Sequence, residues 1–152
     1  MALADLRELN VVTGKVIAAG IEVHRVLGPG LLEAAYLACM VTELREHDLD
    51  IEVQRALPLI YKNVTVPCAF RVDLLVSGCV VVELKCVSEF LAIHQAQLLT
   101  YLKLTGCPVG LLMNFQVPVL KQGIRRVLNT PDNAGGLRGP ADDCGRSPIE
   151  RH

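Results

Sequence analysis

Two apolar segments on either side of a Ser-Gly pair constrain this chain more than any other part of its sequence. Residues 71–76 and 80–85 are rich in Val and Leu, which predicts two buried β-strands, and Ser77 and Gly78 lie between them. Three charged residues interrupt these strands: Asp73, Glu83 and Lys85. Such residues are rarely buried unless they are paired or bind a metal. The fold must therefore accommodate three charges within a core hairpin.

The length of the hairpin loop decides whether these charges meet. Side chains two residues apart on a strand share a face, so Glu83 and Lys85 point the same way. A two-residue loop would place Asp73 opposite Val82, on the wrong face, whereas a loop of odd length or a bulge would pair Asp73 with Glu83. That second register also gathers six apolar side chains on one core face: Val72, Leu74, Val76, Val80, Val82 and Leu84. We expect it because it separates the hydrophobic residues from the charged ones.

Paired carboxylates with a neighbouring lysine permit two interpretations. Carboxylates about 5 Å apart repel each other and are stabilised by a cation, and Mg²⁺ or Mn²⁺ prefers oxygen ligands. An adjacent lysine supplies a point charge suited to a phosphate oxygen or an attacking water. The other interpretation is a structural ion-pair cluster at the end of a sheet. The hairpin residues alone leave both open.

The rest of the chain predicts one α/β domain followed by a tail. Hydrophobic residues make up 51% of the 152 residues and aromatic residues only 4%, which favours an aliphatic core. Periodicity and turn residues predict helices over 9–27, 31–46, 90–104 and 119–128, and strands over 50–56, 57–61, 64–70, 71–76, 80–85 and 109–115. This order predicts a central mixed β-sheet flanked by α-helices. Residues 1–128 form the predicted domain, and the Pro- and Gly-rich residues 129–152 a flexible tail.

Composition argues against several other classes of protein. The longest apolar stretch, residues 74–82, is far below the roughly 20 residues of a membrane span, and the N-terminus does not resemble a signal peptide, so we expect a cytoplasmic protein. The six cysteines form no C-x-x-C pair, which argues against a cysteine metal site. Residues 1–128 carry 12 basic and 12 acidic side chains, which argues against tight non-specific binding of nucleic acid. This balance of charge remains compatible with an enzyme that binds phosphate through a local basic patch and a metal.

Four motifs occur in an order that resembles one family. Gly30-Leu-Leu-Glu33-Ala-Ala-Tyr36 precedes Asp73, which is followed ten residues later by Glu83-Leu84-Lys85 and then by Gln97-Leu-Leu-Thr-Tyr101. These resemble the GxxExxY motif, the D…(D/E)-x-K motif and the Q-x-x-x-Y motif of the GxxExxY protein family, in the RecB-like branch of the PD-(D/E)XK nuclease superfamily. The resemblance spans about residues 9–128 and implies a restriction-endonuclease-like core. Val72 stands where many relatives have Pro, and Phe70 where the RecB-like branch has Gly.

The resemblance also implies a role for each matching residue. Asp73 and Glu83 would bind Mg²⁺ or Mn²⁺, with the Leu84 carbonyl as a further ligand and Glu33 as an outer ligand or the holder of a metal-bound water. Lys85 would orient or deprotonate the attacking water and stabilise charge on phosphorus. Gln97 and Tyr101 would position the substrate backbone or brace the site.

Three functional hypotheses follow. The first is a metal-dependent nuclease acting on nucleic acid, on DNA in preference to RNA. The second is a catalytically weak or inactive module of the same fold that acts through a protein partner, and the third is an assembly role as a homodimer. Several further residues permit either a site role or a structural one: His24, Tyr36, His94, Arg25, Arg71 and Lys103.

Overall fold

A computed structural model describes residues 3–130 of the chain, so the predicted tail lies outside the described residues except for 129 and 130. The helices are α1 (Leu3–Leu27), α2 (Glu33–Glu46), α3 (Ala92–Thr105) and the short 3₁₀ helix η1 (Leu120–Gly123). The strands are β1 (Ile51–Tyr61), β2 (Val64–Val76), β3 (Val80–Lys85), β4 (Val109–Asn114) and β5 (Ile124–Leu128).

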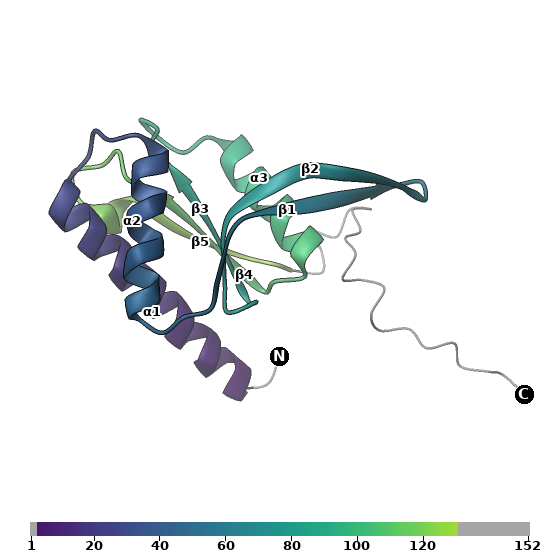
Figure 1. Cartoon of the computed structure of the whole chain (residues 1–152), viewed down its shortest axis with the longest axis horizontal. Helices are drawn as coiled ribbons and strands as arrows, with labels where there is room; N and C mark the ends of the chain where they lie inside the picture. The colour runs from purple at the N-terminus through teal and green to yellow at the C-terminus, as the bar shows by residue number, and fades with distance from the viewer. Residues whose placement is uncertain (1–2, 131–152) are drawn as a thin grey trace, which may run out of the picture.

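The five strands form one mixed sheet in the order β1-β2-β3-β4-β5 (Figure 1). β3 and β4 are parallel, because α3 connects them as a crossover, and the other neighbouring pairs are antiparallel. α1 and α2 pack on one face and α3 on the other. The predicted α/β fold, a mixed sheet flanked by helices, is confirmed.

Each face of the sheet has its own hydrophobic core. One joins α1 and α2 to the sheet through Val16, Val23, Met40, Leu44 and Phe115 among others. The second joins α3 to the sheet through Leu98, Leu102, Val81 and Leu112. All six residues of β4 are buried, as expected for a central strand covered by helices on both faces.

The β2–β3 connection has the odd length that the apolar pattern predicted. Residues 77–79 form a three-residue loop, with Ser77 and Gly78 at positive φ (50° and 64°), and Val76 pairs with Val80. The expected face is confirmed for Leu74, Val76, Val80, Val82 and Leu84, which all pack in the core under α1 and α2. It is wrong for Val72, which packs in the second core, because β2 changes faces next to Gln54, a β1 residue at φ 54°.

The first two strands form a single long hairpin that extends beyond the rest of the sheet (Figure 1). We call residues 53–72 the hairpin arm. Its turn is Lys62-Asn63, with both residues at positive φ (44° and 64°), as a two-residue hairpin turn requires. The prediction of four short strands over residues 50–76 is therefore wrong. Pro58 lies at a register shift in the edge strand, where a missing N–H is tolerated.

The predicted helix over residues 119–128 is also wrong. The segment folds as η1 and then as β5, which pairs with β4 from Val109–Leu128 to Met113–Ile124. Its apolar residues fit either period, and the pairing satisfies the second edge of β4, which a helix would have left open. Within residues 3–130, none of the helices combines the length and the hydropathy needed to cross a bilayer.

Candidate active site

The three charges of the core hairpin lie where β2 separates from β3, a point that we call the fork. The last paired residues are Leu74 and Val82, one position before Asp73 and Glu83. Beyond this pair, hydrogen bonds between a backbone N–H and a side-chain carboxylate replace the backbone–backbone hydrogen bonds between the strands. The Asp73 N–H donates to Oε1 of Glu83 (2.9 Å), and the Leu84 N–H donates to Oδ2 of Asp73 (2.9 Å). Each carboxylate is thus fixed by a backbone amide of the opposite strand.

Gln54 is a residue of the fork that sequence reasoning missed. Its side-chain amide donates to Oδ1 of Asp73 (3.1 Å), across the β1–β2 hairpin. The register of β1 and β2, in which Val53 pairs with Leu74, places Gln54 beside Asp73. The sequence does not reveal this register, because it does not show that β1 and β2 are each one continuous strand.

The two carboxylates have raised pKa values. Burial, and after it the neighbouring Asp73 carboxylate, raise the pKa of Glu83 to about 8, while the Asp73 N–H and Lys85 oppose the change. Burial also raises the pKa of Asp73, while the Leu84 N–H and Lys85 oppose the change. Glu83 is only 4% exposed. The fork therefore concentrates negative charge that this chain only partly compensates.

α3 supplies the partner of Lys85. The Lys85 ammonium donates to Oε1 of Gln97 (3.1 Å), which fixes the end of a long and flexible side chain. Tyr101, one turn further along the helix, is buried, and its ring meets Phe70 edge to face at 5.8 Å. Burial raises the pKa of Tyr101 to about 12, with smaller contributions from Glu83 and Asp73. Gln97 and Tyr101 therefore lie beside the fork on one face of α3.

Glu33 approaches the same site as the first residue of α2. Burial raises its pKa, the Asp73 carboxylate raises it further, and Lys85 lowers it. The side chain thus lies within electrostatic reach of both fork residues, although Glu33 remains an exposed residue. The structure brings together Asp73, Glu83, Lys85, Gln97 and Tyr101, with Glu33 at the margin.

Tyr36 and His24 have structural roles. Tyr36 is fully buried and stacks on Phe115 (4.4 Å between ring centroids). Its hydroxyl donates to the Gly28 carbonyl and accepts from the Leu31 N–H, which holds the loop before Glu33. His24 Nε2 lies 3.2 Å and 2.9 Å from the carbonyl oxygens of Phe115 and Val117.

The remaining candidates lie apart from the fork or at its margin. His94 Nδ1 accepts the Leu91 N–H (3.0 Å) and so caps the start of α3. Arg25 pairs with Glu22 on the surface of α1 (2.7 Å). Arg71 is exposed on the hairpin arm, and Lys103 is half-buried on α3.

The donor set of the fork suits a small, hard divalent cation. Among the residues that the structure describes, no three His, Cys, Asp or Glu side chains come close enough to enclose a metal. Mg²⁺ is commonly held by one or two carboxylates, with waters and substrate phosphates completing its shell. Asp73 and Glu83 fit that pattern, because each carboxylate oxygen that accepts one N–H keeps a second lone pair.

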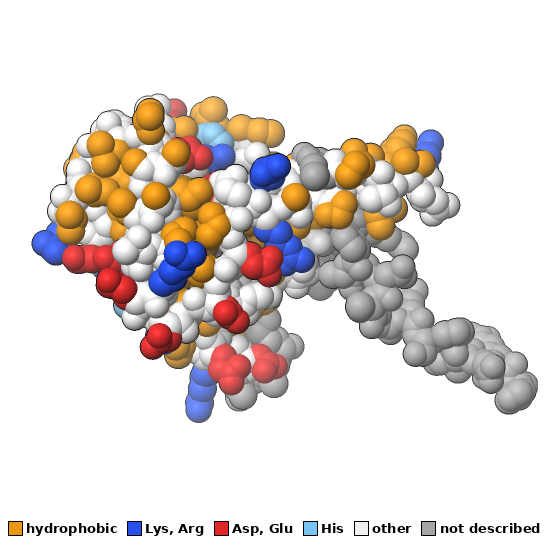
Figure 2. Space-filling model, in the orientation of Figure 1, with side chains coloured by type: hydrophobic (Ala, Val, Ile, Leu, Met, Phe, Trp, Pro, Cys, Tyr) orange, Lys and Arg blue, Asp and Glu red, His pale blue; other side chains and the backbone are white. Residues whose placement is uncertain are grey.

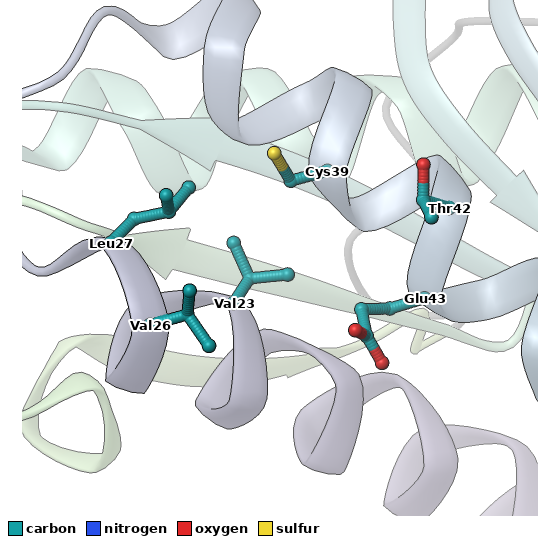
Figure 3. Close-up of a pocket in the computed structure, with 6 residues that line it drawn as sticks. All are labelled: Val23, Val26, Leu27, Cys39, Thr42 and Glu43. Carbon is teal, nitrogen blue, oxygen red and sulfur yellow. The ribbon is translucent and has the colours of Figure 1, made fainter.

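A separate pocket lies between α1 and α2 (Figure 3). Its volume is about 180 Å³, and it is lined by Val23, Val26, Leu27, Cys39, Thr42 and Glu43. None of the fork residues lines it. Figure 2 shows hydrophobic side chains spread over the surface of these two helices.

Comparison with known proteins identifies a family. The family model of the PD-(D/E)XK nuclease superfamily matches residues 10–127, which include α2, the hairpin arm, the fork and α3. Searches of curated proteins and of solved structures found no match.

Proposed function

Because the chain belongs to the PD-(D/E)XK nuclease superfamily, we propose that it hydrolyses phosphodiester bonds of nucleic acid at the fork. The observation that carries this proposal is the convergence of Asp73 and Glu83, with Lys85 held beside them by Gln97. The narrower assignments to the GxxExxY family, the RecB-like branch and a cytoplasmic location stay predictions, as does the preference for DNA over RNA.

Asp73 and Glu83 would hold the divalent cation, Mg²⁺ or Mn²⁺. Their raised pKa values support this role, because a cation between two buried carboxylates relieves their repulsion. Leu84 offers a further oxygen, since the N–H and C=O of one residue in an extended strand point to the same side, here towards Asp73. Glu33 would hold a water of the outer shell. When bound, the cation supplies a Lewis acid that lowers the pKa of water and offsets charge on phosphate.

Lys85 would act on the reacting phosphate itself. Its ammonium has three donors, of which Gln97 accepts one, so two remain for the attacking water and a phosphate oxygen. The water oxygen bonds to phosphorus as the P–O ester bond opposite breaks, and the lysine stabilises the charge that develops. Gln97 and Tyr101 would keep Lys85 and the substrate backbone in position.

Cleavage by purified protein tests this proposal directly. We expect hydrolysis of DNA with Mg²⁺ or Mn²⁺, its loss in EDTA, and a fall of at least about 100-fold in the Asp73→Ala and Lys85→Ala variants. Arg25→Ala, which removes a surface ion pair on α1, is the matched control and should cleave normally. Full cleavage by both site variants would show a contaminating nuclease or a different site.

A non-catalytic module acting through a protein partner is the second candidate. It is favoured by the fork bonds themselves, because the two carboxylates already complete the hydrogen bonding of the separating strands. Calorimetric titration with Mn²⁺ separates the two candidates. Binding that disappears in Glu83→Gln supports the nuclease, whereas a lack of binding at high protein concentration supports the non-catalytic module.

A further inference from the structure

Charge is divided unevenly along the chain, although the folded part is neutral in total. Residues 3–52, which form α1, α2 and the start of β1, contain nine acidic and four basic side chains. Residues 53–130, which form the hairpin arm, α3 and the remaining strands, contain three acidic and eight basic side chains. Arg126 of the second segment contacts Asn10 and Thr13 of α1, but the arm and α3 still hold four basic side chains and no Asp or Glu, so a polyanion is favoured along these two elements.

A pocket of about 410 Å³ opens between the hairpin arm and α3. Its lining is mostly apolar and consists of Phe70, Ile93, Ala96, Gln97 and Thr100. Ile93 is 67% exposed, which is high for a large hydrophobic side chain beside a cavity. Phe70 comes from the arm and the other four residues from α3, so both walls are needed to form it.

The pocket borders the fork through one shared residue, Gln97. Gln97 lines the pocket and also accepts the hydrogen bond of Lys85, so a molecule that contacts Gln97 in the pocket would be separated from the lysine ammonium by that one side chain. Arg71 follows Phe70 directly on the arm. A chain passing from the arm to Lys85 would thus place its anionic groups by the cations and could place an apolar group in the pocket.

We propose that this pocket binds an unpaired base of the strand whose phosphate lies at Lys85, so that the substrate is single-stranded or locally unpaired nucleic acid. The inference rests on the proposed function and specifies its substrate. A phosphate would lose hydration in an apolar pocket without compensation, whereas a base is favoured there. Bases within a duplex are paired and stacked, so only an unpaired base enters, and the Phe70 ring offers it an aromatic surface.

The charge of the walls favours nucleic acid over a protein partner or a second copy of this chain. Residues 53–72 and 90–105 contain four basic side chains and no Asp or Glu: Arg55, Lys62, Arg71 and Lys103. Arg55 is partly compensated by Glu52, at 3.4 Å, which leaves the other three for phosphates. An apolar pocket with an aromatic side chain, between two elements whose charged side chains are all basic, is an arrangement that single-strand binding proteins use.

Binding measurements without hydrolysis test the pocket. The probes are a fluorescent oligothymidylate, a duplex of equal length and an abasic strand that keeps the phosphates but lacks the bases, all measured by anisotropy in EDTA. Ala96→Glu places a carboxylate in the pocket at an exposed helical position, and Ala18→Glu is the matched control on α1. We expect the thymidine strand to bind at least about tenfold more tightly than the other two probes, and Ala96→Glu alone to remove that preference.

Three results would overturn the proposal: equal binding of the abasic strand, an unchanged affinity in Ala96→Glu, or a dimer of the wild type that Ala96→Glu dissociates. The last would show that a second copy covers the pocket. Cleavage distinguishes this inference from the proposed function. If the wild type cleaves single strands with metal and the Ala96→Glu variant cleaves them equally well, the pocket does not bind the base, and the proposed nuclease activity stands. If the probes bind as expected but no strand is cleaved, the result supports base binding in the pocket and contradicts the proposed nuclease activity.

Discussion

Glu83 is the only buried residue among the Asp, Glu, Lys and Arg residues that the structure describes. Its carboxyl is buried beside Asp73, and its pKa of about 8 lies above the ordinary value of 4.5. A carboxyl with a raised pKa in the folded state makes its full contribution to stability below the unfolded pKa and loses it as the pH rises through the folded pKa. For Glu83 that window runs from pH 4.5 to about 8.

We therefore predict that the melting temperature of the metal-free protein falls as the pH rises from about 4.5 to about 8. Glu83→Gln keeps the shape without the charge and should flatten this dependence, and Mg²⁺ should stabilise the wild type more at pH 8 than at pH 5. Calorimetry or circular dichroism across the window measures both effects. A profile that is identical in the wild type and Glu83→Gln would contradict the assignment.

Gln97 acts through Lys85, which makes it a positioning residue. Gln97→Ala removes the acceptor of the lysine ammonium, and we expect the rate of cleavage to fall about tenfold. The same substitution in a Lys85→Ala background should have little further effect, because the two residues act as one unit. Gln95→Ala, an exposed neighbour on α3, is the control. Additive losses in the double variant would show that Gln97 acts independently of the lysine.

Among the elements, the β2–β3 hairpin, α2, α3 and β4 were largely predictable from sequence, whereas the continuous strands of the hairpin arm and β5 were not. The odd loop followed from six apolar residues that must share a face, and only Val72 departs from that pattern. The departure occurs opposite Gln54, which has a positive φ, a conformation that no pattern predicts for a non-glycine residue. β5 was missed because its strand conformation depends on pairing with β4, from Met113–Ile124 to Val109–Leu128, and not on the local period of its own residues.

The hairpin arm is the element whose contribution to binding is easiest to isolate. Lys62 occupies its turn, with the ammonium 5.5 Å from the centre of the Tyr61 ring. In Figure 2 hydrophobic side chains extend along the arm and a basic side chain lies at its tip. From Asp73 to the turn the strand measures about 33 Å, which is close to one turn of duplex DNA or a run of several nucleotides.

We predict that Lys62→Ala lowers the salt dependence of binding without changing the fold. One phosphate contact contributes about 0.7 to the slope of log K against log salt for a single strand, so the slope should fall by about that amount. Lys15→Ala, on α1 across the sheet, removes the same charge and should leave the slope unchanged. Equal slopes for Lys62→Ala and the wild type would place the tip outside the path of the strand.

For the whole molecule, the candidate site depends on how closely α3 approaches the sheet. Gly110 lies in β4, opposite Val81 of β3, and beneath Leu98 of α3. A Cβ at this position would lie 2.7–2.9 Å from three side-chain carbons of Leu98. The lack of a side chain therefore sets the distance between α3 and the sheet, and with it the reach from Gln97 to Lys85.

We predict that Gly110→Ala destabilises the protein by about 1–3 kcal/mol, because overpacking forces α3 away from the sheet. Cleavage per folded molecule should also fall several-fold, since Gln97 moves with the helix. Gly14→Ala is the matched control: it lies on α1 with no atom within 4 Å of an added Cβ, so it should stabilise by about 1 kcal/mol and cleave normally. Denaturant unfolding and cleavage rates measure the two effects. A Gly110→Ala protein that loses stability but cleaves at the wild-type rate would show that the site does not depend on the position of α3.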